Sequence, residues 1–121
     1  MNRLKLASPF LLLILNNFLF SQTWVQQTSG TTLRLTCIYF INSSTGYIGA
    51  DSGKVLKTTN GGTNWLLQNV NTGGGIPVAG IKFFSSTVGI AAGQKIMKTT
   101  DAGATWFSVH DSAYAIDICC Q

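Results

Sequence analysis

The strongest constraint on this chain is a repeat with a fixed period. The run KTTNGGTNW at residues 57–65 returns as KTTDAGATW at residues 98–106, and Trp24, Trp65 and Trp106 follow one another at intervals of 41 residues. Self-similarity at about 40–45 residues is typical of β-propellers, in which each repeat forms one four-stranded blade. The period therefore predicts an all-β chain that folds as a partial β-propeller.

Each copy of the repeat has the pattern of a β-hairpin. An apolar run at residues 55–56 or 96–97 leads into Lys-Thr-Thr, and a tight turn follows at residues 60–62 or 101–103. Asn-Gly between apolar runs favours a hairpin, because glycine tolerates a positive φ and Asn or Asp accepts hydrogen bonds from the turn backbone. We expect strands on both sides of each turn, with the Trp ring buried between neighbouring sheets.

The repeated turn resembles the Asp-box, or BNR, repeat, whose pattern is Ser/Thr-x-Asp-x-Gly-x-x-Trp. Residues 99–106 match every fixed position, and residues 58–65 match with Asn60 in place of Asp, which keeps an oxygen acceptor but loses the charge. The resemblance implies that the box lies at the turn between the last two strands of a blade, away from the ligand face. It also implies a structural role for eight residues: Thr58, Asn60, Gly62, Trp65, Thr99, Asp101, Gly103 and Trp106.

More of the sequence aligns around the boxes. IYF at residues 38–40 matches IKF at 81–83, GYI at 46–48 matches GIA at 89–91, and KVLK at 54–57 matches KIMK at 95–98. A third unit begins after Trp106, with a candidate strand at residues 116–118. The pattern looks most like the photosystem II assembly and stability factor group of these repeats. We therefore predict about two and a half four-stranded antiparallel blades within residues 22–121.

The number of blades is low for a propeller, which usually closes with about four to eight. Three explanations are open. The chain is a fragment of a longer product, it assembles with copies of itself into a closed ring, or it is a small open stack. We favour the fragment, because the sequence stops in the middle of a repeat, just after a predicted strand.

The N-terminal residues 1–21 have the three-part layout of a secretory signal peptide. A short basic start precedes a mostly apolar stretch at residues 7–20, and Ser21 offers a cleavage point. A membrane anchor is the alternative, but a spanning helix needs about 20 apolar residues, and this stretch is shorter and contains Asn and Pro. We expect cleavage after Ser21, a secreted or periplasmic location as in exported bacterial proteins, and no stable membrane insertion afterwards.

The composition argues against several kinds of site. Removal of residues 1–21 takes away two basic residues and lowers the formal net charge from +4 to +2, too little to predict a nucleic-acid partner. The single histidine, His110, is expected in an exposed loop, and without a Cys-x-x-Cys motif we predict no zinc site and no cofactor. Cys37, Cys119 and Cys120 form an odd set. Three separate thiols are the simpler interpretation, and a bridge between blades is the alternative.

The inventory of catalytic groups does not predict an enzyme. Sialidases, which share the Asp-box propeller, need several Arg, a Tyr nucleophile with a Glu partner and an acidic Asp. Beyond residue 21 the chain has one Arg, Arg34, and no Glu. We predict an exported, non-catalytic module that binds a protein or glycan surface. The alternative is a fragment of a sialidase-like glycoside hydrolase whose catalytic residues lie outside this chain.

Overall fold

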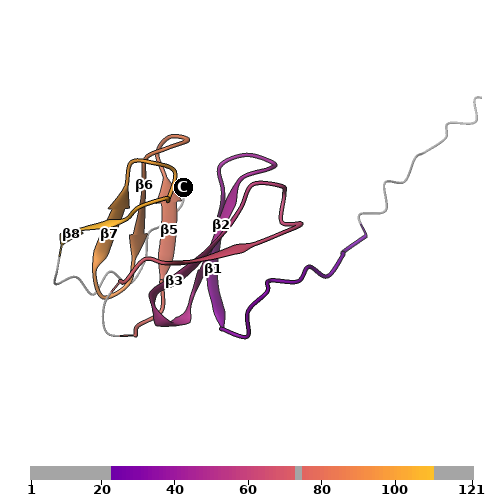
Figure 1. The fold of residues 1–121 in the computed structure, drawn as a ribbon, viewed down its shortest axis with the longest axis horizontal. Helices are drawn as coiled ribbons and strands as arrows, with labels where there is room; N and C mark the ends of the chain where they lie inside the picture. The colour runs from indigo at the N-terminus through magenta and orange to yellow at the C-terminus, as the bar shows by residue number, and fades with distance from the viewer. Residues whose placement is uncertain (1–22, 73–74, 111–121) are drawn as a thin grey trace, which may run out of the picture.

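Two four-stranded antiparallel sheets make up the part of the chain that the computed structural model describes, residues 23–72 and 75–110 (Figure 1). We call the sheet β1-β2-β3-β4 blade 1 and the sheet β5-β6-β7-β8 blade 2. The strands are β1 (Leu35–Phe40), β2 (Gly46–Ala50), β3 (Lys54–Thr58), β4 (Leu66–Asn69), β5 (Gly80–Phe83), β6 (Gly89–Ala92), β7 (Ile96–Thr99) and β8 (Phe107–His110). The predicted all-β class and four-stranded blades are confirmed. The signal peptide at residues 1–21 and the candidate strand at 116–118 lie outside the described residues.

The two blades repeat the same register, as the alignment of the two copies predicts. In blade 1 Ile38 pairs with Ile48, and Ile48 with Leu56. In blade 2 Ile81 pairs with Ala91, and Ala91 with Met97. The β2–β3 hairpin is two residues longer than the β6–β7 hairpin, and the extra residues fall in the short 3-10 turn η1 (Asp51–Gly53), between strands, so the pairing is unchanged.

Each blade has two faces, because successive side chains of a strand point to opposite sides of the sheet. We call the face toward the following blade the forward face and the face toward the preceding blade the rear face. The forward face of blade 1 carries Cys37, Tyr39, Tyr47, Val55 and Lys57, and the rear face of blade 2 carries Ile81, Phe83, Ala91, Met97 and Thr99. The main core lies between these two faces.

Aromatic rings form the centre of this core. Phe83, only 5% exposed, stacks on Tyr47 with ring centroids 4.3 Å apart and on Tyr39 at 6.2 Å. The Tyr39 hydroxyl donates a hydrogen bond to the Phe83 carbonyl across the blades, at 3.0 Å. Packing of this kind excludes water and orients the two sheets relative to one another.

Glycine is required beneath the rear-face aromatic ring of each blade. Phe40 pairs with Gly46, and a Cβ on that glycine would lie 2.6 Å from the Phe40 ring. Phe83 pairs with Gly89, where a Cβ would lie 2.7 Å from the ring. The repeated Gly-Tyr and Gly-Ile pairs therefore mark the position where a ring covers the neighbouring strand.

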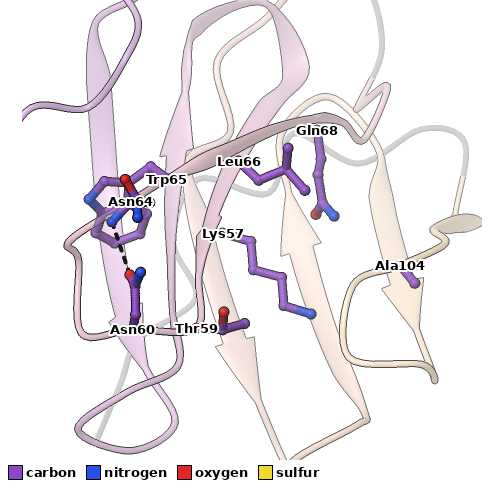
Figure 2. Close-up of a pocket in the computed structure, with 8 residues that line it drawn as sticks. All are labelled: Lys57, Thr59, Asn60, Asn64, Trp65, Leu66, Gln68 and Ala104. Atoms are coloured by element: carbon purple, nitrogen blue, oxygen red, sulfur yellow. Dashed lines mark hydrogen bonds between the residues drawn. The ribbon is translucent and has the colours of Figure 1, made fainter.

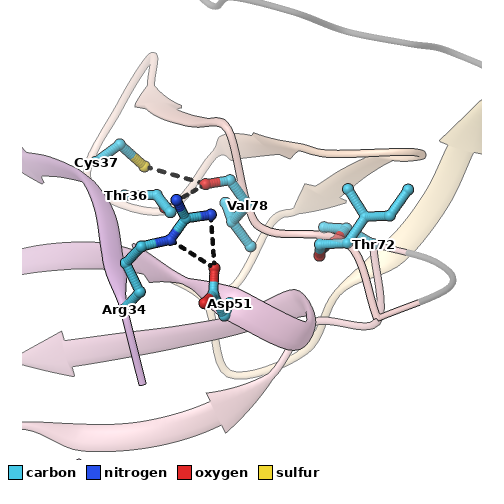
Figure 3. Close-up of polar contacts among 7 residues, drawn as sticks. Arg34, Thr36, Cys37, Asp51, Thr72 and Val78 are labelled. Carbon is cyan, nitrogen blue, oxygen red and sulfur yellow. Dashed lines mark hydrogen bonds and ion pairs between the residues drawn. The ribbon is translucent and has the colours of Figure 1, made fainter. Parts of the chain in front are cut away.

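The connection between the blades is tied to β1 at the end of the sheets opposite the Lys-Thr-Thr turns. The Thr36 hydroxyl and the Cys37 thiol both donate to the Val78 carbonyl, the latter at 3.8 Å (Figure 3). Nearby, Arg34 forms an exposed ion pair with Asp51 at 3.3 Å. The two bonds to the Val78 carbonyl hold the segment before β5 against blade 1. Cys119 and Cys120 lie outside the described residues, so the alternative of a disulfide stays a prediction.

One expectation about the end of blade 2 is wrong. His110 does not lie in a loop: it is the last residue of β8 and pairs with Ile96. The ladder reaches His110 because the register shifts between Ile96 and Met97 and lengthens the pairing of the outer strand. Within the described residues, no helix is long and apolar enough to cross a membrane.

Candidate functional site: the box turns and the groove between the blades

The first box turn, residues 58–65, is organised around two side-chain oxygens. The Thr58 hydroxyl oxygen accepts hydrogen bonds from the Asn60 and Gly62 N–H groups at 3.3 and 2.9 Å. The same hydroxyl donates to the Asn60 amide oxygen at 3.0 Å, and that oxygen accepts from the Asn64 N–H at 2.9 Å. Side chains thus satisfy the backbone donors of a turn that cannot join the sheet ladder.

The second box turn, residues 99–106, repeats this network atom for atom. Thr99 Oγ1 accepts from the Asp101 and Gly103 N–H groups at 3.3 and 2.8 Å and donates to Asp101 Oδ1 at 2.8 Å. The carboxylate also accepts from the N–H and the hydroxyl of Thr105. All eight residues assigned to the boxes therefore lie in two equivalent turns. Whether their role is structural stays a prediction, which the Thr99 variant described in the Discussion tests.

The charge of Asp101 is the chemical difference between the two turns. Hydrogen bonds from the Thr105 hydroxyl, the Thr105 N–H and the Thr99 hydroxyl lower the pKa of Asp101 to about 2. Its pKa in the unfolded chain is about 3.9, so the carboxylate contributes stability that is complete above about pH 4 and is lost as the pH falls toward 2. The first turn, with Asn60, has no such dependence.

We therefore expect Asp101→Asn to make the thermal stability depend less on pH in the acid range. Thermal melts at pH 7, 4 and 2 should show wild type losing more stability between pH 4 and 2 than the variant does, because only wild type must protonate a hydrogen-bonded carboxylate. The reverse change in the other turn, Asn60→Asp, should increase the stability that is lost between pH 4 and pH 2. Parallel profiles for all three proteins would contradict this account.

The second box turn also links the two blades. The Ala102 carbonyl accepts hydrogen bonds from the Tyr47 hydroxyl and from Lys57 Nζ, both at 2.6 Å and both from the forward face of blade 1. Burial, with a smaller contribution from the charge of Asp101, raises the pKa of Tyr47 to about 12, so this hydroxyl keeps its proton at ordinary pH. Gly103 has a φ of 79°, and a Cβ there would lie 3.0 Å from the Tyr47 ring. This contact requires glycine at the box position.

The box tryptophans are half-buried and pack on the rear face of their own blade. Trp106 lies edge-on to Phe83 at 6.2 Å and donates from Nε1 to the Gly103 carbonyl at 3.2 Å. Trp65 packs edge-on to Phe40 at 6.1 Å. Trp24, at the same repeat position one period earlier, is 96% exposed. No described strands surround Trp24, which accounts for its exposure.

A groove of about 410 Å³ lies between β4 of blade 1 and the second box turn. Its walls include Lys57, Trp65, Leu66 and Gln68, with Ala104 on the side of blade 2 (Figure 2). Leu66 is 65% exposed although it belongs to the forward face that blade 2 covers. The groove is thus an apolar gap at the outer rim, where the two blades diverge.

One polar atom in the groove lacks the partner that burial normally requires. Within the described part of the chain, Gln68 Oε1 is buried without a hydrogen-bond partner. A buried acceptor of this kind carries a desolvation cost that a ligand N–H would relieve. Beside it, β4 is the last strand of its sheet, so its outer backbone groups are available for a further strand.

The described carboxylates do not form a catalytic pair. Asp51 lies in η1 and is paired with Arg34, whereas Asp101 lies in the box turn of the other blade. Among the residues that the structure describes, no group of three His, Cys, Asp or Glu side chains converges on a metal position. Asp111 and Asp117 lie outside the described residues.

Comparisons with known proteins show which folds resemble this arrangement of two sheets. No protein-family model matches the chain, and no curated protein does. Solved structures do match, among them YCF48 bound to a D1 peptide, with a TM-score of 0.59 and 19% identity, and YCF48 from Cyanidioschyzon merolae, with 0.60 and 18%. The chain is built of β-propeller blades. The predicted resemblance to this group of propellers is confirmed at the level of the fold.

The match covers more of this chain than of the solved structures. It includes 70% of the chain and 27% of the YCF48 with the D1 peptide, and 76% of the chain and 32% of the Cyanidioschyzon merolae protein. The chain thus spans about a third or less of those propellers.

Sequence reasoning did not find the groove. Leu66 and Gln68 stand outside the box motif, and the motif alone says nothing about the space between blades. The available signal was the alternation along β4, which places these two residues on the forward face beside Lys57.

Proposed function

We propose that this chain is an exported, non-catalytic propeller module that binds an extended segment of a partner protein in the groove beside β4. The observation that carries the proposal is the buried Gln68 Oε1 without a partner, in an apolar groove at a sheet edge. An extended peptide supplies N–H groups along its length, and it adds to an exposed strand through main-chain hydrogen bonds.

The groove chemistry favours a peptide over a glycan. Leu66 offers apolar surface for a side chain of the ligand, and Gln68 Oε1 offers an acceptor without a partner in the described part of the chain. Lys57 is already engaged with the Ala102 carbonyl. One of the matched propellers is bound to a D1 peptide, which supports a protein ligand for a fold of this kind.

Selection from a phage-displayed peptide library on the immobilised chain tests the proposal. We expect a recurring extended motif, and its synthetic peptide should bind about tenfold more weakly to Gln68→Ala and to Leu66→Asp, since each change removes a contact worth about 1.4 kcal/mol. Affinity is measured by fluorescence anisotropy.

The matched control is the next residue of the same strand. Leu67, 47% exposed, lies on the opposite face of β4, so Leu67→Asp adds the same charge to the same strand without entering the groove. Its peptide affinity should equal that of wild type. Failure to select any motif, or equal losses for Leu66→Asp and Leu67→Asp, would overturn the proposal.

A further inference from the structure

The contact between the two blades shows what each face of this repeat binds. The centre of the forward face of blade 1 is covered: Tyr47 and Val55 are 0% exposed. The rear face of blade 2 is covered equally well, with Ile81 at 3% and Phe83 at 5%. One chain thus contains a complete example of a forward face packed on a rear face.

Among the residues that the structure describes, the same two kinds of face are also present without a covering blade. On the rear face of blade 1, Ile38 and Phe40 hold the positions of Ile81 and Phe83, but they are 63% and 40% exposed. On the forward face of blade 2, Ile90 and Ile96 hold the positions of the buried Tyr47 and Val55 and are only half-buried. Leu33 and Trp65 cover only the centre of the rear face, at Ile48 and Leu56.

Several groups on the two uncovered faces match the contact that already exists, although Lys82 stands where Tyr39 does in that contact. In a contact between two copies, Ile90 of one copy would take the place of Tyr47 and would face Phe40 of the other copy, so this contact would stay apolar. Lys98 holds the position of Lys57, and the Gly61 carbonyl of the first box turn holds the position of the Ala102 carbonyl that accepts from Lys57. The backbone supports this equivalence, because the Gly61 and Ala102 N–H groups make matching bonds to Ser44 and Thr87 at 2.8 and 2.9 Å.

We infer that copies of this chain bind head to tail, with the forward face of blade 2 in one copy packed on the rear face of blade 1 in the next. The occupant of each uncovered face is thus a second copy, because the interface continues one that the chain already forms within itself. A heterologous contact of this kind closes into a ring when the rotation fits. Propellers of about four to eight blades correspond to about two to four copies when each copy contributes the two described blades.

The N-terminal residues do not compete for the same place. Residues 25–28, which follow Trp24, stand at the repeat position of a fourth strand, which β8 of the neighbouring copy would occupy. They lie outside both sheets, with Trp24 96% and Val25 74% exposed. In Figure 1 this segment, in indigo, runs away from the blades.

Light scattering coupled to size-exclusion chromatography on the purified full chain tests the inference. Mass spectrometry of the same sample shows whether the chain begins at Gln22, as cleavage after Ser21 would leave it. We expect a discrete oligomer for wild type and for the control Ser86→Asp, whose charge lies on an exposed turn away from both faces. Ile38→Asp should block the rear face and Ile90→Asp the forward face, so each variant alone should be monomeric.

Mixing the two variants distinguishes this arrangement from other kinds of association. The Ile38→Asp chain keeps an intact forward face and the Ile90→Asp chain an intact rear face, so an equimolar mixture should form a one-to-one dimer and nothing larger. Phe40→Asp provides a second rear-face variant, and circular dichroism verifies that each variant is folded. A monomeric wild type would overturn the inference and leave these faces to a different partner. A mixture that stays monomeric would overturn it as well.

Discussion

Replacement of Phe83 by alanine is expected to lower the free energy of unfolding by about 3–5 kcal/mol, the largest loss for a single change in this chain. The ring is 5% exposed and contacts Tyr47, Tyr39 and Trp106. Its removal leaves a cavity in the middle of the contact between the blades, which the two sheets cannot close without losing the Tyr39 and Tyr47 hydrogen bonds. Urea unfolding followed by tryptophan fluorescence measures the loss.

The neighbouring residue is the matched control for this change. Phe84 is 63% exposed, so Phe84→Ala should change the stability by no more than about 0.5 kcal/mol. Phe83→Leu keeps most of the volume and should cost about 1–1.5 kcal/mol, which provides a measurable value even where the alanine variant is unfolded. Similar losses for Phe83→Ala and Phe84→Ala would show that the contact between the blades does not hold this fold together.

The fold was predictable from the sequence because the same pattern of residues occurs in two copies. The 41-residue period sets the blade, and the alternation of apolar residues in runs such as KVLK and KIMK sets the faces of each sheet. The box turns were predictable for the same reason: Thr58 and Asn60 act within four residues of their hydrogen-bond partners. Local chemistry of this kind is visible in a short window of sequence.

The contacts between the blades were not predictable in the same way. Tyr47 and Ala102 are distant in the sequence, and Ile90 replaces the tyrosine at the equivalent position, so comparing the two copies does not reveal the hydrogen bond. The groove at Gln68 depends on how far the outer strands diverge, which no spacing of residues specifies. The position of His110 was predicted wrongly because a register shift extends β8 as far as this residue. The alternation of apolar residues does not indicate such a shift.

The second large effect is expected at the buried hydroxyl of the second box turn. Thr99 is 0% exposed, and its oxygen accepts from the Asp101 and Gly103 N–H groups while its hydrogen binds the Asp101 carboxylate. Thr99→Val keeps the shape of the side chain but leaves the buried Gly103 donor without an acceptor, so we expect a loss of about 1–3 kcal/mol in the free energy of unfolding. Thr100→Val is the matched control: this side chain is exposed, and the change should be nearly neutral.

The same pair of variants separates a structural role of the boxes from a binding role. If the boxes maintain the fold, Thr99→Val lowers stability while the folded fraction still binds the selected peptide with the affinity of wild type. Thr58→Val should behave in the same way, because Thr58 accepts from Gly62 as Thr99 accepts from Gly103. A loss of peptide affinity without a loss of stability would reverse the assignment, since the box would then be a ligand contact. The hydrogen bonds favour the structural outcome, because each Thr hydroxyl is already fully engaged within its own turn.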